Sequence, residues 1–461
     1  MLRHRLSILV GLGLASLALY GVVARIPNLR RAIPAFEVVY FALFALYLVA
    51  IVLGLAWEHA ADSSPRSLRG ALLTIVLGGV AFRMLLLPTA PTLSDDMYRY
   101  VWDGRVQAAG ISPYRYPPNA PDLIQLRLSD RTIWPNINRK SAVTIYPPAA
   151  QLAFRGIYAV VPDNITWTKV AMTLAELTTL ALLAVWLRQR HLSPLRIVVL
   201  AWSPLAVFEI AGHGHMDALV LLPLTGALLV RERRQTGWLG FCLGLATLLK
   251  LYPALWLPAL WTRRDWKAPL AFASTVAAGY VLFLGNGGSV LGFLPNYLDE
   301  RFNGGPADWL AVAAQWLMQL DKPPYGAMQL VQFGVLIGLS AWFVWRPAGS
   351  ADQARQRVWL IMAAVVLLSQ NLFSWYLLAI LPLLVVDLQR GRWGLRFNAA
   401  TGWLLFTGLV ALSYTYFIHR QPQAWAIGLQ YVPLLIFLLV PPWLARRRTR
   451  RVGGAASERT A

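Results

Sequence analysis

Two adjacent carboxylates, Asp95 and Asp96, open a charged and aromatic run at residues 94–105, shortly after a hydrophobic segment. Carboxylates beside lipid cost free energy unless they line a wet cavity, are paired, or take part in chemistry. A carboxylate can remove the proton of a hydroxyl group as a general base. We therefore expect the reaction centre at this run.

Other polar residues come from segments that are far apart in the sequence. Positively charged side chains near a carboxylate pair can hold the phosphate leaving group of a lipid-linked substrate. The pattern indicates group transfer from a lipid-linked phosphate. The further candidates are Arg99, Arg105, His213, His215, Asp217, Lys250, Gln370, Asn371 and Tyr376.

Several candidates also have a structural interpretation. Asp95 and Asp96 could cap the helix that starts near Met97. The 213–217 segment contains too few ligands for a full metal coordination sphere, so no metal is indicated. Glu176 and Glu209 are intramembrane acids without an evident partner. The remaining alternatives are helix-surface ion pairs for Arg99, Asp103 and Arg105, a hydrogen-bonded turn for His213, His215 and Asp217, and snorkelling to the membrane interface for Lys250 and Arg83.

The composition determines which elements position these residues. The chain has 461 residues, of which 57% are apolar and 14% charged, and its mean hydropathy is +0.52. These values predict an all-α, polytopic integral membrane protein. The net charge of +21 is spread over short basic clusters between apolar segments, which indicates membrane orientation and not nucleic-acid binding. The single cysteine, Cys242, excludes an intrachain disulfide framework.

The apolar segments predict about 14 helices (12 to 14) with both termini in the cytoplasm. Basic clusters after residue 187 then all fall on the cytoplasmic side, and the Asp95 loop lies outside. Residues 1–24 could instead be a cleavable signal peptide, which leaves this topology unchanged. We predict a short surface or re-entrant helix at 146–161, and a helical hairpin broken near Pro253. The predicted organisation is one domain at 1–452, with outer loops at 89–145 and 286–325, and a disordered tail at 453–461.

Short motifs follow one another between residues 90 and 385. They are Asp95-Asp96 with Tyr98 and Trp102, then Gly110-Ile111-Ser112-Pro113-Tyr114-Arg115-Tyr116, Tyr146-Pro147-Pro148, Leu249-Lys250-Leu251-Tyr252-Pro253, and Ser369-Gln370 with Trp375-Tyr376 and Leu381-Pro382. The ordered set resembles the GT-C glycosyltransferases that use polyprenyl-phosphate sugars, in particular GPI mannosyltransferase I and bacterial polyprenyl-phosphomannose-dependent mannosyltransferases. The sequence departs from the GPI enzyme in having Asp-Asp where that enzyme has Asp-x-Asp.

The resemblance implies a GT-C-like fold and an inverting transfer, in which a carboxylate of the first outer loop is the base and the polyprenyl phosphate leaves. The first acid of the family's motif falls on Asp95, and Asp96 would orient the acceptor or the base. No cofactor is required, and a metal ion is not indicated. The residues expected to bind substrate are Tyr98, Arg99, Trp102, Arg105, Tyr146, His213, His215, Asp217, Lys250, Gln370, Trp375 and Tyr376.

The expected function is transfer of a hexose, mannose by the resemblance, to a lipid-linked or glycan acceptor at the outer face of the bacterial inner membrane. The partners are then the polyprenyl-phosphate sugar, the acceptor and membrane lipids, and not nucleic acid. The main alternative is a flippase for a lipid-linked sugar, which would place polar sites near the membrane midplane within an inverted repeat. An O-antigen ligase would need a large outer loop late in the chain. No repeat is visible, and the longest loop is early.

Overall fold

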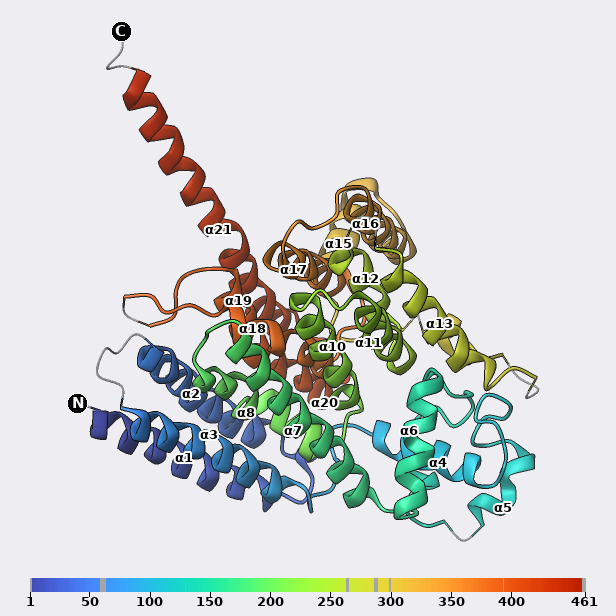
Figure 1. Ribbon diagram of the computed structural model, residues 1–461. Coiled ribbons are helices and arrows are strands. Elements are labelled where there is room, and N and C mark those ends of the chain that lie inside the picture. Colours follow the sequence, from blue (N-terminus) through green and yellow to red (C-terminus); the bar gives the residue numbers. More distant parts are fainter. Residues whose placement is uncertain are drawn as a thin grey trace.

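The computed structural model shown in Figure 1 is helical throughout the residues that it describes. Within these residues, pairing of extended chain is limited to two isolated bridges, Phe302 with Asn371 and Arg390 with Leu395. The predicted all-α class is therefore confirmed. The structure describes residues 2–58, 64–128, 130–262, 265–285, 289–297, 300–392 and 394–457.

Within these ranges, seven helices are long and apolar enough to cross a membrane. A bent pair, Pro194–Ala201 and Pro204–Gly212, makes an angle of 51° and would be an eighth span. These helices confirm a polytopic membrane protein, whereas the predicted count of about 14 is not confirmed. The seven are α1 (Leu2–Ala24), α2 (Ile33–Glu58), α3 (Pro65–Leu86), α7 (Ile165–Gln189), α16 (Tyr325–Trp345), the segment α19 (Ala399–Leu409) with η8 (Val410–Thr415) and α20 (Tyr416–His419), and α21 (Ala424–Ser457).

The count differs because other apolar segments are short or interrupted. A helix needs about 20 residues to span the hydrocarbon core. As predicted, the chain breaks near Pro253, where α11 ends at Leu249 before a 3-10 turn. The shorter helices include α10 (Asp217–Glu232), α11 (Thr236–Leu249), α12 (Trp256–Leu260), α13 (Lys267–Val281), α17 (Ala351–Leu368) and the segment η7 (Ser374–Ile380) with α18 (Leu381–Asp387).

The predicted first outer loop, residues 89–145, folds together with the following helix as a small helical unit, which lies at the lower right of Figure 1. The loop contains α4 (Asp96–Ala108) and α5 (Ile124–Arg127), and the following helix is α6 (Pro148–Val160). Helix α6 has 13 residues, which is too short to span a bilayer, and it packs against α4. The unit has its own apolar core, formed by Val101, Trp102, Val106, Leu123, Ile133 and Ile137.

The second outer loop contains α14 (Leu294–Tyr297) and α15 (Pro306–Met318), while residues 286–288 and 298–299 lie outside the described residues. The amide of Phe293 donates to the carbonyl of Thr144 at 3.2 Å, which joins the second loop to the first. At the other end of the chain, the structure describes α21 as helix from Ala424 to Ser457.

A buried arginine closes the break in the bent span. Arg83 is fully buried, so the prediction that it snorkels to the interface is wrong. Its Nε donates to Glu176 Oε2 at 2.7 Å, and its Nη1 donates to the carbonyl of Ala201 at 2.7 Å. Helix α8 (Val198–Ala201) ends there, and its last carbonyls have no amide partner within the helix. Arg83 therefore satisfies a helix end that water cannot reach, and Glu176 balances its charge.

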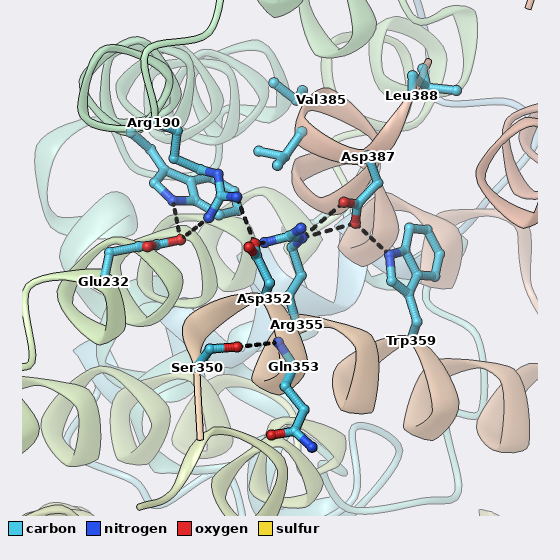
Figure 2. Close-up of polar contacts among 12 residues, drawn as sticks. Arg190, Glu232, Ser350, Asp352, Gln353, Arg355, Trp359, Val385, Asp387 and Leu388 are labelled. Carbon is cyan, nitrogen blue, oxygen red and sulfur yellow. Dashed lines mark hydrogen bonds and ion pairs between the residues drawn. The ribbon is translucent and has the colours of Figure 1, made fainter. Parts of the chain in front are cut away.

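The ends of α7, α10, α17 and α18 are joined by the ion pairs in Figure 2. Arg190, next to the end of α7, pairs with Glu232 of α10 and with Asp352 of α17. Arg355 of α17 pairs with Asp352 at 2.6 Å and with Asp387 of α18 at 2.9 Å. These contacts fix four helices to one another at one end of the bundle.

Candidate active site

A cavity of about 640 Å³ lies between the two outer loops and the helical body. Of the residues expected to act from the sequence, six line it: Asp95, Asp96, Tyr146, Lys250, Trp375 and Tyr376. The other lining residues are Arg30, Leu93, Ser94, Tyr100, Asn138, Arg139, Ile145, Pro147, Leu251, Tyr252, Leu294, Phe302, Phe373, Ser374, Tyr414, Tyr416 and Phe417.

Asp95 occupies the N-cap position of α4, but its side chain makes no capping hydrogen bond. Its Oδ1 instead accepts a hydrogen bond from Arg30 Nη2 at 3.0 Å. The Asp95 side chain is 39% exposed. Capping therefore does not account for this carboxylate, which faces the cavity and is paired with a cation.

Asp96 is the more buried acid of the pair, with a side chain that is 20% exposed. Its Oδ1 accepts a hydrogen bond from Asn138 Nδ2 at 2.8 Å, and its Oδ2 lies 4.0 Å from His215 Nδ1. Burial raises the pKa of Asp96 above its usual range, although the Asn138 hydrogen bond opposes this effect. The buried carboxylate is therefore a stronger base than a solvent-exposed aspartate.

His215 lies behind the cavity wall and is fully buried. Its ring stacks on Trp375 with centroids 3.8 Å apart, and its Nε2 lies 3.4 Å from Glu209 Oε2. Burial lowers the pKa of His215 well below its usual value, so the ring is neutral. Glu209, which had no evident partner in the sequence, accepts hydrogen bonds from Ser374 Oγ at 2.7 Å and Tyr414 Oη at 2.5 Å. The imidazole thus stands between two carboxylates.

The turn that carries His215 needs a glycine. Gly214 has φ +71°, and a Cβ at this position would collide with Met97 Cε. The amide of His215 donates to the carbonyl of Glu209 at 2.9 Å, so this segment is the hydrogen-bonded turn that was the structural alternative. Among the described residues, no group of three or more His, Cys, Asp or Glu side chains is placed to hold a metal ion.

Lys250 and Asp217 form an ion pair at the edge of the cavity. Lys250 Nζ lies 2.7 and 2.8 Å from the two oxygens of Asp217, whose side chain is 3% exposed. The ammonium also lies 4.6 Å from the ring centroid of Tyr376. Lys250 is therefore held by a buried acid and an aromatic ring.

Two of the predicted substrate-binding cations do not line the cavity. Arg99 pairs with Asp103 at 2.8 Å within α4 and donates to the carbonyl of Ala142. Arg99 thus forms the ion pair within a helix that was the structural alternative for it. Arg105 pairs with Asp130 and, at 2.6 Å, with Asp163. Both arginines thus make ion pairs in or next to the first outer loop and lie outside the lining of the cavity.

Four other candidates also lie away from the cavity lining. Trp102 is in the core of the first loop, and Tyr98 packs against that core. His213 is buried. Gln370 is buried and its Nε2 donates to the carbonyl of Tyr325 at 2.9 Å.

The sequence did not point to several polar residues of the cavity. Arg30 lies in the short connection between α1 and α2, and its proximity to Asp95 depends on the hydrogen bond from the Leu29 amide to Thr92 Oγ1 at 2.9 Å. Asn138 and Arg139 lie in an irregular part of the first loop, where no periodicity indicates which side chains face inward. Their positions follow from tertiary contacts only.

Comparison with known proteins adds an independent assignment. The sequence model for glycosyltransferase family 87 matches residues 144–374, which is half of the chain. An alpha-(1->6)-mannopyranosyltransferase A from Mycobacterium tuberculosis is 27% identical over 214 residues, which cover 43% of this chain and 40% of that protein. The match thus spans less than half the length of this relative. The family segment includes Tyr146, the His215 turn and Lys250, and the chain belongs to glycosyltransferase family 87.

Proposed function

We propose that this chain is an integral membrane glycosyltransferase that transfers mannose from a polyprenyl-phosphate sugar to a hydroxyl group of a lipid-linked or glycan acceptor. The observation that carries the proposal is the pair of adjacent carboxylates, Asp95 and Asp96, in a cavity of about 640 Å³ that also presents cations and aromatic side chains. Membership of the family and the name of the mycobacterial relative support sugar transfer and the choice of mannose.

The chemistry needs few groups. Asp95 takes the proton of the acceptor hydroxyl group, whose oxygen forms a bond to the anomeric carbon of the sugar. The bond between this carbon and the phosphate oxygen breaks on the opposite face, and its electron pair leaves with the polyprenyl phosphate. The configuration at the anomeric carbon is therefore inverted. Asp96, more buried and hydrogen-bonded by Asn138, orients the acceptor or the base.

The cations of the cavity are suited to the donor phosphate. Of the three candidates expected from the sequence, only Lys250 lines the cavity, together with Arg30 and Arg139. Positive charge at the leaving oxygen stabilises the negative charge that develops there. The apolar part of the donor needs an apolar surface. The rings of Phe302, Phe373, Tyr416 and Phe417 provide such a surface in the cavity.

The position of the cavity favours an enzyme over a flippase. Helix α10 begins at Asp217, which pairs with the cavity residue Lys250, and ends at Glu232 in the ion-pair network of Figure 2. The cavity thus lies at one end of this helix and is lined by residues of the loops 89–145 and 286–325, which the sequence predicts outside the membrane, whereas a flippase places its site near the midplane. We place this end at the outer face of a bacterial cytoplasmic membrane, because the basic clusters belong to the other side.

The test is transfer from labelled polyprenyl-phosphomannose by the purified protein in membranes. We expect Asp95→Asn to lower the rate roughly 10²- to 10⁴-fold, since a general base contributes this much. Asp96→Asn should lower it less. Asp122→Asn is the matched control, because Asp122 is an exposed acid of the same loop and does not line the cavity.

Failure of the wild type to transfer any sugar from a panel of polyprenyl-phosphate donors would contradict the proposal. Movement of the intact lipid-linked sugar across the membrane, with no transfer, would favour the flippase.

A further inference from the structure

The three cations of the cavity differ in how firmly they are engaged. Lys250 contacts both oxygens of Asp217, and its removal would leave a buried carboxylate unpaired. Arg139 is held by two contacts to Glu300, one of which joins Arg139 Nε to Glu300 Oε1 at 2.6 Å. Each of these two cations therefore contacts both oxygens of its acid and would have to break two contacts to change partner.

Arg30 is engaged less completely. The single ion pair found for it joins Nη2 to Asp95 Oδ1 at 3.0 Å. Its Nε is buried and has no hydrogen-bond partner among the residues that the structure describes. A guanidinium group carries five N–H donors in a planar fork, so most of its donors remain for a second partner. The guanidinium carbon lies 4.6 Å from the ring centroid of Phe417, which covers one face of the plane.

The backbone around Arg30 is fixed. It belongs to the 3-10 turn Leu29–Arg31, where the side chain of Asn28 accepts a hydrogen bond from the amide of Arg31 at 3.2 Å. The amide of Leu29 donates to Thr92 Oγ1, three residues before Asp95. Arg30 and Asp95 are thus carried by two segments that are tied together, and a change of partner needs only a rotation of the arginine side chain.

We propose that Arg30 is the residue that binds the donor phosphate, and that it exchanges Asp95 for this phosphate when the donor binds. The inference rests on the proposed function. Before the donor arrives, Arg30 holds Asp95 as an ion pair. The donor phosphate then takes the guanidinium, and the carboxylate is released to accept the proton of the acceptor hydroxyl group. As the glycosidic bond breaks, Arg30 stabilises the charge that the phosphate gains.

The exchange makes Asp95 and the phosphate competitors for one cation, and this competition is measurable without turnover. The probe is a short-chain polyprenyl monophosphate, with the uncharged polyprenol as its control, binding to the purified protein in detergent. We expect Arg30→Gln to weaken monophosphate binding roughly tenfold or more, since a charge-assisted hydrogen bond is lost. Polyprenol binding should not change. Arg139→Gln, the matched control in the same cavity, should have a smaller effect.

A double-mutant cycle separates exchange from general electrostatics. Asp95→Asn removes the carboxylate that competes with the phosphate for Arg30. In the protein that keeps Arg30, this substitution should tighten monophosphate binding several-fold. The same substitution in the Arg30→Gln background should tighten it distinctly less, because no guanidinium is left to be released. Arg30→Lys keeps the charge but not the planar fork, and provides the comparison if Arg30→Gln does not fold.

Additive effects of the two substitutions would overturn the exchange, and so would unchanged monophosphate binding by Arg30→Gln. If the cycle shows the coupling but the wild type transfers no sugar from any polyprenyl-phosphate donor, the proposed function is wrong while the Arg30 exchange stands.

Discussion

Burial separates the roles of the two adjacent carboxylates. The Asp95 side chain is 39% exposed and the Asp96 side chain 20%. Asp96 also faces a buried, neutral imidazole on one side and an amide on the other. A carboxylate in such surroundings is a better proton acceptor, but its ionised form destabilises the folded protein. Asp96 therefore costs stability in its ionised form, and we assign to it the orientation of the acceptor or the base, while Asp95, the more exposed acid, is the proposed base.

The raised pKa of Asp96 predicts a pH-dependent stability difference. The pKa of Asp96 is higher in the folded than in the unfolded protein. The folded protein therefore has its full stability below the unfolded pKa, where the carboxyl group is protonated in both states. Part of this stability is lost as the pH rises through the folded pKa. Asp96→Asn imitates the protonated form at every pH. We expect this variant to be more stable than the wild type at pH 7, with the difference decreasing as the pH falls toward the unfolded pKa of the carboxyl group.

Thermal unfolding in detergent between pH 4 and 8 measures this difference, with Asp122→Asn as the exposed control. A variant that is less stable at pH 7, or a difference that does not depend on pH, would contradict the assignment.

His215 offers a test of the buried cluster behind the cavity. Its ring packs on Trp375, whereas its nitrogens face Asp96 and Glu209. His215→Phe keeps an aromatic ring for stacking and removes both nitrogens. We expect kcat to fall roughly tenfold to a hundredfold through misplacement of Asp96, with little change in the KM for the donor, because His215 is fully buried behind the wall. Steady-state kinetics and the Tm check this, and a change confined to KM would contradict it.

At the level of residues, the sequence predicts the centre of the site better than its edges. Two adjacent carboxylates near lipid cost free energy unless they have a function, and this argument predicted a role for Asp95 and Asp96. Both residues line the cavity. Arg99 and Arg105 were expected beside them, but the direction of a side chain on α4 depends on what the first loop packs against. Arg30 was missed because only the folded chain brings the connection between α1 and α2 to Asp95.

At the level of elements, buried cations satisfy helix ends inside the bundle. Arg83 does this for α8, and Lys169 Nζ donates to the carbonyls of Leu86 and Thr89, both at 2.7 Å, where α3 ends. Arg196 donates to three carbonyls at the end of α18. Carbonyls at helix ends have no partner within the helix, and in lipid they have no water either. A cation therefore stabilises each of these helix ends.

Glu176 tests this arrangement, because it is the acid that balances Arg83. Glu176→Leu should destabilise the protein by about 3 to 5 kcal/mol, since it leaves a buried cation unpaired. The double variant Arg83→Met with Glu176→Leu should recover part of this loss, but not all of it, because the carbonyl of Ala201 then has no donor. Unfolding in mixed detergent gives both values. A Glu176→Leu variant as stable as the wild type would contradict the pairing.

Apolar length in the sequence identifies the continuous spans but does not show where a span is interrupted. Helix α2 has 26 residues and is evident from hydropathy alone. The segment after residue 194 instead passes through a 3-10 turn, two short helices and the π-helical turn Val207–Gly212. Such breaks depend on Arg83 and on neighbouring helices, which the local sequence does not contain.

At the scale of the whole molecule, two segments connect the cavity with the ion-pair network of Figure 2. Helix α10 runs from Asp217 to Glu232, and the segment Ser374–Asp387 runs from the cavity wall to Asp387. The network should therefore contribute to stability and not to the chemical step. Arg355, 9% exposed, is its most buried cation, whereas Asp352 is 58% exposed.

Arg355→Ala and Asp352→Ala should consequently differ. Loss of Arg355 leaves the Asp387 carboxylate without its cation and should cost about 3 kcal/mol. Loss of Asp352, an exposed partner, should cost less than about 1 kcal/mol. We expect kcat at 25 °C to be unchanged in both variants. Thermal unfolding in detergent together with the transfer assay measures these effects, and a loss of rate in a stably folded Arg355→Ala protein would contradict a purely structural role.

The orientation of the molecule decides which donor can reach the cavity. Nucleotide sugars are made in the cytoplasm, whereas a polyprenyl-phosphate sugar can present its head group at the outer face. The arrangement of basic clusters predicts that the loop of Asp95 lies outside and the connection between α10 and α11 inside. In a Cys242→Ala background, Asp122→Cys should react with a membrane-impermeant maleimide in intact cells, and Gln235→Cys only after permeabilisation. Both positions are exposed. The opposite labelling would place the carboxylate pair in the cytoplasm, where the argument for a lipid-linked donor no longer holds.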